Sequence, residues 1–304
     1  IKDYFGNGSN FGVNISYFTE DTPLGTAGSV KNAEDFLDES FIVISGDSLT
    51  NMDITKAIEF HKMKNSKATL VLTRVDVPLE YGVVITDKYG SITGFLEKPS
   101  WGEVFSDTVN TGTYILEPEV LKYLEKGKKV DFSQDLFPHL LLKKEPMYGY
   151  VMDDYWCDIG DLQAYLQAHY DVLEGKIQLD INATEIKKGV WVGAGSTIDP
   201  DAIINPPCVI GDNCRIESGA VIDSLSVIGD NNVIERESSI KRSVIWNGSF
   251  IEYGSEIRGA ILCNKTNLKR YVHIFENAIV GDNCLINERV VIKPNVKIWP
   301  QKSV

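Results

Sequence analysis

Two carboxylates of this chain follow apolar runs, at positions where they could bind a metal ion. Asp47 comes after the hydrophobic residues 41–44, Ser45 and a glycine, and Asp158 stands in the W-C-D-I-G run of residues 156–160. Ligands of α/β sheets bind beyond the carboxyl ends of the strands, and Mg²⁺ prefers carboxylate oxygens when it also holds substrate phosphates. The alternative is that Asp47 caps a turn and Asp158 caps a helix starting at Leu162, and spacing alone does not decide between the two.

Strands and helices alternate over the first 175 residues, and these elements would position the carboxylates. Apolar and alternating runs predict strands at 13–18, 41–45, 68–74, 82–86, 92–96, 109–116 and 147–151. Helical spacing or a capping residue predicts helices at 26–37, after Asp53, at 133–142 and at 162–173. The order is typical of an α/β domain, and it predicts a largely parallel sheet covered by helices on both faces.

An aliphatic residue then returns at every sixth position from Val192 to Ile298, with Trp246 taking one of these positions and five-residue steps at 246–251 and 257–262. Neither a helix nor an ordinary strand has this period, whereas a parallel β-helix does. Three hexapeptides close one coil, so about six coils are predicted. A β-sandwich would instead need period-two alternation with turns about every 8–12 residues. Gly-Asp-Asn sequences supply residues suited to the corners, at 211–213, 229–231 and 281–283.

The composition argues against several classes of partner. With 43 acidic and 30 basic residues the net charge is −13, which disfavours nucleic acid or an anionic membrane surface. No apolar stretch approaches the ~20 residues of a membrane span and no signal peptide is recognisable, so a cytoplasmic location is predicted. The five cysteines are odd in number and lack C-x-x-C spacing, which fits a reducing compartment and no cysteine metal site.

Six short motifs follow one another along residues 1–175. They are P-L-G-T-A-G at 23–28, S-G-D at 45–47, E-Y-G-V-V at 80–84, F-L-E-K-P at 95–99, N-T-G-T-Y at 110–114 and W-C-D-I-G at 156–160. In order and approximate spacing they resemble the sugar-1-phosphate nucleotidyltransferases, or nucleotide-sugar pyrophosphorylases. The resemblance implies a Rossmann-like nucleotidyltransferase domain at 1–175, incomplete at its N-terminus. It also implies a left-handed hexapeptide β-helix after it, at 176–304.

The resemblance implies roles on the nucleotide side of the site. Leu24, Gly25 and Gly28 match the loop that packs against the nucleobase. Asp47 and Asp158 match the carboxylates that hold Mg²⁺ beside the phosphates. Mg²⁺ is therefore the expected cofactor, and an NTP and a sugar 1-phosphate are the expected small-molecule partners.

Five further positions match the sugar-phosphate side of the family's site. The amide of Gly82 meets the phosphate, Glu97 accepts hydrogen bonds from sugar hydroxyls, and Lys98 neutralises phosphate charge. Asn110 and Thr111 match the polar groups around the sugar. The residue types suit these roles, because a lysine serves a phosphate as a point charge and a carboxylate can fix two vicinal hydroxyls.

The implied reaction is attack by a sugar 1-phosphate oxygen on the α-phosphorus of an NTP, which releases pyrophosphate. The nucleophile is already ionised at neutral pH, so catalysis rests on alignment and on charge neutralisation, with Asp47, Lys98 and Asp158 as the catalytic groups. The motifs look most like those of the guanylyltransferases that use GTP and mannose 1-phosphate. Glucose-1-phosphate enzymes that use UTP, TTP or ATP are the alternative.

One departure from the family is clear. Its glycine-rich loop G-G-x-G-[ST]-R-L and a later phosphate-binding lysine do not occur in these 304 residues. We expect either a fragment of a longer protein, which is favoured, or a vestigial catalytic domain, and in both cases little activity of this chain alone.

Two other functional classes stay open. A hexapeptide acyltransferase would use a histidine base, but His273, the only histidine of the repeats, is expected on the outer surface. A non-catalytic regulatory or assembly subunit would explain the absent loop. In either case the last coil near Ile298 has no capping helix, and we expect a partner subunit or a further domain to cover it, with homo-oligomers formed through the β-helix.

Overall fold

The computed structural model describes residues 1–304 apart from Lys98, Trp101, Glu103, Phe105 and the side chain of Glu97. The chain forms two compact units, Ile1–Trp156 and Cys157–Val304. The domain boundary predicted after residue 175 stays a prediction. No helix in the described part of the chain is long and apolar enough to cross a membrane.

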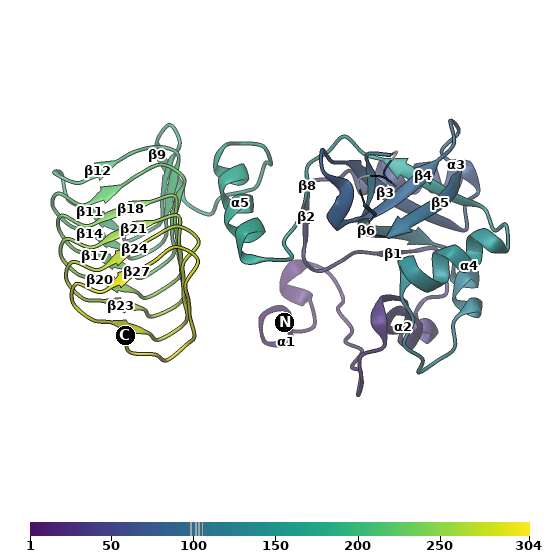
Figure 1. Cartoon of the computed structure of the whole chain (residues 1–304), viewed down its shortest axis with the longest axis horizontal. Helices are drawn as coiled ribbons and strands as arrows, with labels where there is room; N and C mark the ends of the chain where they lie inside the picture. Colours follow the sequence, from purple (N-terminus) through teal and green to yellow (C-terminus); the bar gives the residue numbers. More distant parts are fainter. Residues whose placement is uncertain (98, 101, 103, 105) are drawn as a thin grey trace. The chain divides into compact units, whose positions relative to one another are not determined.

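The first unit combines short helices with a sheet (Figure 1). Its helical elements are α1 (Lys2–Phe5), η1 (Ser9–Phe11), α2 (Gly25–Asn32), η2 (Glu34–Phe36), α3 (Ile54–Lys64), η3 (Pro78–Glu80), η4 (Pro118–Tyr123), η5 (Phe132–Leu136) and α4 (Phe137–Leu142). Its strands are β1 (Phe41–Val43), β2 (Ser48–Thr50), β3 (Ala68–Arg74), β4 (Gly82–Thr86), β5 (Ile92–Glu97), β6 (Thr108–Leu116) and β7 (Met147–Val151), and β8 (Trp156–Asp158) begins at its last residue.

The sheet is mixed, with the order β5-β4-β6-β3-β7 and with β1 also paired to β6. Among these described pairs only β3–β7 is parallel, whereas β4–β5, β4–β6, β3–β6 and β1–β6 are antiparallel. The prediction of a largely parallel sheet is therefore wrong. The reason is that β4, β5 and β6 follow one another with no helix among the described residues between them, and antiparallel neighbours need no helical crossover.

Two local predictions also differ from the structure. Residues 13–18 form no strand, because the amides of Val13 and Ile15 donate to the nearby carbonyls of Gly8 and Asn7 instead of to a neighbouring strand. The helix predicted over 26–37 ends at Asn32 and gives way to the 3₁₀ turn η2. Strands β3, β4 and β7 have the predicted bounds, and Asp53 caps α3 by accepting from the amides of Thr55 and Lys56.

Helices cover both faces of this sheet (Figure 1). On one face, α2 and the η5–α4 segment contribute Ala27, Leu136, Phe137 and Leu140 to a core that includes β3 and β6. On the other face, Ala57 of α3 packs with Val71, Ile115 and Met152. The predicted layering is thus confirmed although the strand directions are not.

The second unit contains helix α5 (Leu162–Leu173), which has the predicted bounds, and a parallel β-helix. After the antiparallel strand β9 (Thr184–Lys187), short strands run from β10 (Val190–Val192) to β28 (Lys297–Ile298) and form three parallel sheets. Figure 1 shows the coils stacked in chain order. Val190 pairs with Cys208, and Cys208 with Ser226, so one coil is 18 residues long. This confirms the predicted β-helix of about six coils, and the arrangement is consistent with the left-handed form.

The intermediate strands of the three sheets are short and regularly spaced. They are β11 (Thr197–Ile198), β12 (Ile203–Ile204), β13 (Cys208–Ile210), β14 (Arg215–Ile216), β15 (Val221–Ile222), β16 (Ser226–Ile228), β17 (Val233–Ile234), β18 (Ser239–Lys241), β19 (Val244–Ile245), β20 (Phe250–Ile251), β21 (Glu256–Arg258), β22 (Ile261–Leu262), β23 (Asn267–Leu268), β24 (His273–Ile274), β25 (Ile279–Val280), β26 (Leu285–Ile286) and β27 (Val291–Ile292).

The inward position of one coil differs from the prediction. Ile245 is 1% exposed whereas Trp246 is 37% exposed, so Ile245 and not Trp246 belongs to the buried column. The first five-residue step therefore lies between Ile240 and Ile245. The indole of Trp246 packs outside against α5, where its Nε1 donates to the hydroxyl of Tyr165 at 3.1 Å.

Helix α5 packs on the outer face of the β-helix beside the two shortened coils. Leu166 and Tyr170 form a buried cluster with the outward residues Val244 and Ile261. The hydroxyl of Tyr170 donates to the carbonyl of Arg242. Arg242 lies in the corner within the five-residue step between Ile240 and Ile245. The five-residue steps thus coincide with the surface that α5 covers.

Candidate functional site

A bulge in β6 is the centre of the predicted site. The register between β3 and β6 shifts between Leu70 and Leu72, which leaves extra residues in β6 around Gly112, whose φ is 76°. Val109 pairs with β4, whereas Tyr114 pairs with β1. The bulge therefore lies where the edge of β6 passes from one neighbouring strand to the other, and bulges of this kind are common at functional sites.

The loop after β1 is held against this bulge and carries Asp47. The amide of Ser45 donates to the carbonyl of Gly112 at 3.2 Å, and Ser48 Oγ donates to the carbonyl of Thr111 at 3.3 Å. Asp47 is exposed and accepts a hydrogen bond from Ser45 Oγ. The structure thus holds the loop that carries Asp47 against residues 111–112, at the carboxyl end of β1.

Asn110 and Thr111 hold the bulge through their side chains. Thr111 is 2% exposed and donates through Oγ1 to the carbonyl of Val71 at 2.8 Å. Asn110 donates through Nδ2 to the hydroxyls of Tyr114, at 2.8 Å, and Ser133, at 3.2 Å, and its Oδ1 accepts from the amide of Gly112. Their contact with a sugar stays a prediction, since the structure gives both side chains internal partners.

Gly82 and Glu97 face each other in the β4–β5 ladder. The register that pairs Val83 with Val109 brings Gly82, one residue further along, next to Asn110. The structure therefore gathers Gly82, the backbone of Glu97 and the bulge at one place. Lys98 and the side chain of Glu97 lie outside the described residues, so their predicted roles stay predictions.

The predicted nucleobase loop packs against residues 128–130. The amides of Ala27 and Gly28 both donate to the carbonyl of Val130, at 3.0 and 3.1 Å, and the amide of Val130 donates to the carbonyl of Leu24 at 2.8 Å. A Cβ on Gly25 would lie 2.6 Å from that carbonyl of Val130, and one on Gly28 would lie 2.6 Å from the carbonyl of Lys128. Both glycines are therefore required by the close approach of two backbones, which is a structural reason for them beside the predicted contact with a base.

A negative charge lies at the start of α2. Glu20 accepts from the amide of Leu24 at 3.0 Å. Hydrogen bonds from Ser29 and from the Leu24 amide hold the pKa of the Glu20 carboxyl below its usual range. A carboxylate at this position complements the partial positive charge of the helix N-terminus. The N-terminus of α2 therefore has a negative partner within the chain, the Glu20 carboxylate.

Asp131 and Ser133, which were not predicted as site residues, connect the nucleobase loop to the bulge. Thr26 Oγ1 donates to Asp131 Oδ2 at 2.8 Å, and Asp131 Oδ1 accepts from the amide of Ser133 as the N-cap of η5. Ser133 Oγ in turn accepts from Asn110. An Asp two residues before a Ser, at the start of a helical run, is a capping signal that could have placed the start of this segment at Phe132.

Trp156 closes the same region from the carboxyl end of the first unit. Its indole Nε1 donates to the carbonyl of Thr111 at 3.2 Å, and its ring packs edge-on against Tyr81 with centroids 5.6 Å apart. Asp158 follows two residues later and belongs to the second unit. Its predicted pairing with Asp47 around a metal therefore stays a prediction.

The donor set fits a magnesium ion bound with its substrate better than a structural metal. In the described part of the chain no group of three or more His, Cys, Asp or Glu side chains could hold a metal ion. Mg²⁺ is usually bound by one or two carboxylates together with substrate phosphates and water. The exposed carboxylate of Asp47 suits that mode.

The first unit is a mixed α/β domain and the second contains a hexapeptide β-helix, and both match known families. Residues 1–175 match the family model described as Nucleotidyl transferase. Residues 185–224 match the bacterial transferase hexapeptide model, and residues 215–304 match the GMPPB C-terminal domain. The chain belongs to the nucleotidyl transferase family.

Two curated proteins and one solved structure are similar to this chain. A UTP–glucose-1-phosphate uridylyltransferase of Synechocystis is 38% identical over 67% of this chain and 56% of its own length. A mannose-1-phosphate guanyltransferase of Debaryomyces hansenii is 33% identical over 97% of this chain and 78% of its own length. A Bacillus anthracis protein assigned as a glucose-1-phosphate thymidylyltransferase, solved in complex with sucrose, is 26% identical with a TM-score of 0.51, covering 59% of this chain and 73% of that one.

Several of these matches cover only part of the relative's own length. Two of the curated relatives, the Synechocystis protein among them, are matched over 56% and 48% of their own length. This chain therefore spans about half of their length.

Proposed function

We propose that the protein transfers a nucleotidyl group from an NTP to a sugar 1-phosphate, with GTP and mannose 1-phosphate as the favoured pair. The observation that carries the proposal is the convergence of the predicted residues. The β1–β2 loop with Asp47, the β6 bulge with Asn110, and Gly82 on β4 lie side by side in one unit. The D. hansenii relative, which matches nearly the whole chain, bears the name of this activity.

The reaction places modest demands on the chain's own residues. The attacking group is a phosphate oxygen that is already ionised near pH 7, so no side chain has to remove a proton. The site has to align two anionic substrates and offset their repulsion. The backbone amide of Gly82 is proposed to meet the sugar phosphate, and the packed glycine loop at 24–28 fixes one wall for a base.

Mg²⁺ would supply the neutralisation of phosphate charge. Asp47 is the residue of the first unit that would hold it, and Asp158 is proposed as the second ligand. The bond from Ser45 orients the Asp47 carboxylate, so replacing Asp47 removes charge from the site but leaves the hydrogen bonds of Ser45 and Ser48 to residues 111–112 in place.

The decisive experiment measures pyrophosphate release with Mg²⁺, crossing GTP, UTP, TTP and ATP with mannose 1-phosphate and glucose 1-phosphate. It is run on this chain and on the whole product of its gene. We expect turnover of one pair by the gene product and little by this chain, which lacks the glycine-rich loop sequence. Release with no pair from either protein would overturn the catalytic proposal and favour a subunit that only binds nucleotide sugars.

Asp47→Asn in the active protein tests the site itself. We expect kcat/KM to fall on the order of a hundredfold or more, because one charged group that neutralises the transition state is lost. Asp38→Asn is the matched control, since Asp38 is an exposed carboxylate of the same unit that precedes the amino end of β1, whereas Asp47 follows its carboxyl end. Equal activity of both variants would contradict the assignment of Asp47.

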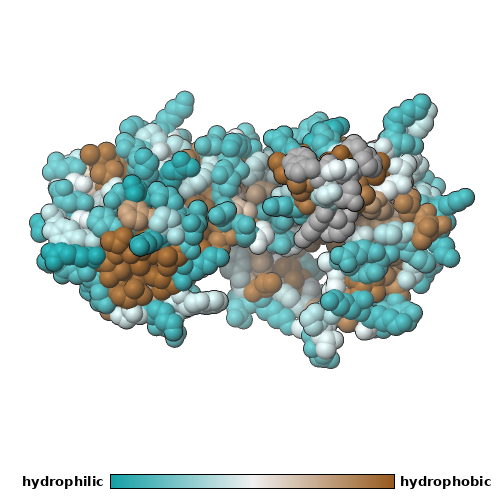
Figure 2. Space-filling view, viewed as in Figure 1, coloured by the Kyte–Doolittle hydropathy of each residue, from teal (hydrophilic) through white to brown (hydrophobic). Residues whose placement is uncertain are grey.

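We further propose that the protein assembles through its β-helix and acts in the cytoplasm. A patch of hydrophobic residues lies on the exposed surface of the β-helix unit (Figure 2). Surface patches of this kind mark interaction sites when they are large, which supports assembly. Light scattering at several protein concentrations tests it, and a monomer at every concentration would contradict it.

A further inference from the structure

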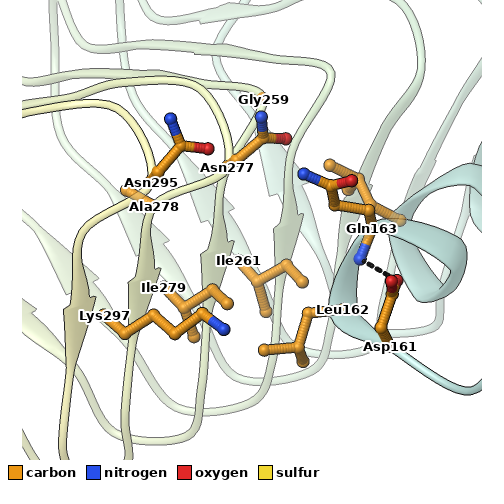
Figure 3. Close-up of a pocket in the computed structure, with 11 residues that line it drawn as sticks. Asp161, Leu162, Gln163, Gly259, Ile261, Asn277, Ala278, Ile279, Asn295 and Lys297 are labelled. Atoms are coloured by element: carbon orange, nitrogen blue, oxygen red, sulfur yellow. Dashed lines mark hydrogen bonds between the residues drawn. The ribbon is translucent and has the colours of Figure 1, made fainter.

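A groove runs between α5 and the β-helix, within the second unit (Figure 3). It consists of two adjoining cavities of about 440 and 680 Å³, which share Gln163, Leu166, Gly259 and Asn277 as lining residues. Each volume lies in the range of small-molecule sites, about 300–1,000 Å³. All residues that line the groove belong to the second unit.

One end of the groove has an apolar floor. Ile261, Ile279 and Lys297 occupy equivalent positions in three successive strands of one sheet. Ile261 packs in the buried cluster beneath α5, and the row continues past the helix as Ile279 and Lys297. Figure 3 shows Leu162 of α5 facing Ile261 and Ile279 across the gap. Aliphatic walls of this kind suit the apolar faces of a ring.

Amide side chains line the rim above this floor. Asn277 and Asn295 lie at the same corner of successive coils, and both have a left-handed backbone, with φ of 61° and 64°. Gln163 of α5 faces Asn277 (Figure 3). Three carboxamides offer both donors and acceptors, which suits the hydrogen-bonding edge of a heteroaromatic base.

Cations gather at the other end. Lys241, Arg242 and Arg258 line the second cavity. Aromatic rings support both guanidinium groups, because Arg242 lies 5.2 Å from the ring centre of Tyr170 and Arg258 4.6 Å from that of Phe275. Such stacking keeps the planar donors extended toward anions.

Neutralisation of these cations is incomplete. Lys241 pairs with Asp223 at 3.2 Å, and Arg258 Nε lies 3.4 Å from Glu256 and 3.8 Å from Glu276. Even so, Arg258 Nε is buried and has no hydrogen-bond acceptor in the described part of the chain. In the described part of the chain, Arg242 and Lys297, which also line the groove, have no ion-pair partner, in a chain whose net charge is −13.

We propose that this groove binds a nucleoside diphosphate, with the base between Leu162 and the isoleucines and the phosphates at the arginines. The observations that carry this are an apolar slot, three amides at its rim and a cationic end in one continuous groove. Leu162 and Gln163 follow Asp158 by only a few residues, so a ligand here contacts the turn just after that predicted metal ligand. Binding of a nucleoside diphosphate in the groove does not depend on the proposed function. An effect of that binding on catalysis rests on the proposed function.

The test uses the isotope-labelled 304-residue chain and GDP as the probe. We expect GDP to shift the side-chain amide resonances of Gln163, Asn277 and Asn295, with saturation near about 1 mM or below. Guanosine alone and pyrophosphate alone should each bind at least tenfold more weakly. Either one binding as tightly as GDP would overturn the proposed division of the groove.

Charge and filling variants sharpen the result. Arg242→Glu and Gln163→Trp should each weaken GDP binding at least tenfold, and both positions are exposed, so folding is preserved. Lys302→Glu carries the same charge change outside the groove and should leave binding unchanged. If GDP shifts only resonances of the first unit, such as the amides of Gly82 and Gly112, this inference fails while the proposed function stands. Shifts confined to the groove would support the inference and count against nucleotide binding by the first unit.

Discussion

At the scale of single residues, glycines decide how the nucleobase loop is built. Gly25 and Gly28 lie where α2 meets residues 128–130, and a Cβ on either would lie 2.6 Å from a backbone carbonyl. Real Cβ atoms do not approach so closely, so the two backbones would have to separate. The positive φ of Gly25, 72°, adds strain for any other residue. These positions therefore serve the architecture whatever ligand the loop contacts.

Replacing Gly28 with Ala should destabilise the first unit by about 1–3 kcal/mol, because overpacking against a fixed backbone costs about that much. Gly46→Ala is the matched control, since nothing lies within 4 Å of a Cβ placed there. Amide hydrogen exchange at Ala27, Gly28 and Val130 under native conditions would measure the difference. Unchanged protection in Gly28→Ala would show that residues 128–130 can move aside without cost.

At the scale of elements, α5 is bound to the β-helix by an apolar face and a few polar contacts. Leu166 and Tyr170 are buried against the outer strands, and each such side chain contributes about 1.5–3 kcal/mol when fully buried. His169 lies on the same helix and packs edge-on against Tyr165 at 4.7 Å. Burial lowers the pKa of His169 from its usual value of 6.5.

The sign of this pKa shift predicts how the second unit responds to acid. Below pH 6.5 the unfolded chain binds a proton at His169 that the folded unit resists, so stability is complete above pH 6.5 and falls as the pH drops through the lowered value. His169→Gln should remove part of this loss, while His273→Gln, on the outer face of β24, should keep it. Thermal unfolding between pH 7.5 and 5 measures the effect, and identical pH dependence of the two variants would contradict it.

At the scale of the whole molecule, the two units place the cysteines unequally. Cys208, Cys214, Cys263 and Cys284 belong to the β-helix. Cys214 and Cys284 each follow a Gly-Asp-Asn corner and are each 1% exposed. The thiol of Cys214 donates to the carbonyl of Gly229 at 3.0 Å. Burial raises the pKa of Cys208 and Cys263 to about 11.

Thiol reactivity should therefore report unfolding of the β-helix. At pH 8 a thiol of pKa about 11 is ionised in about one molecule in a thousand, and the thiolate is the reactive form. We expect the thiols of the folded Cys157→Ser chain to be labelled at least tenfold more slowly than those of the same chain unfolded in guanidinium, where all four remaining thiols react. Labelling of Cys208 at the rate of a free thiol would show that the first coils open readily.

The sequence by itself determined what depends on local repetition. The six-residue period encodes inward-pointing side chains coil after coil, so the β-helix, its corners and the outward position of His273 follow from it. The bounds of β3, β7 and α5 follow from local periodicity and caps. The position of Asp47 beyond β1 needed only a hydrophobic strand followed by Ser-Gly-Asp.

The tertiary structure alone decided what depends on distant partners. Strand direction is set by which strands pair, and β6 lies antiparallel between β3 and β4 although the element order suggested a parallel sheet. Trp246 or Ile245 could each have filled the core, and only the packing of Trp246 against Tyr165 of α5 turned the indole outward. The connection from the 24–28 loop through Asp131 and Ser133 to Asn110 spans about a hundred residues of sequence, so no local pattern could have revealed it.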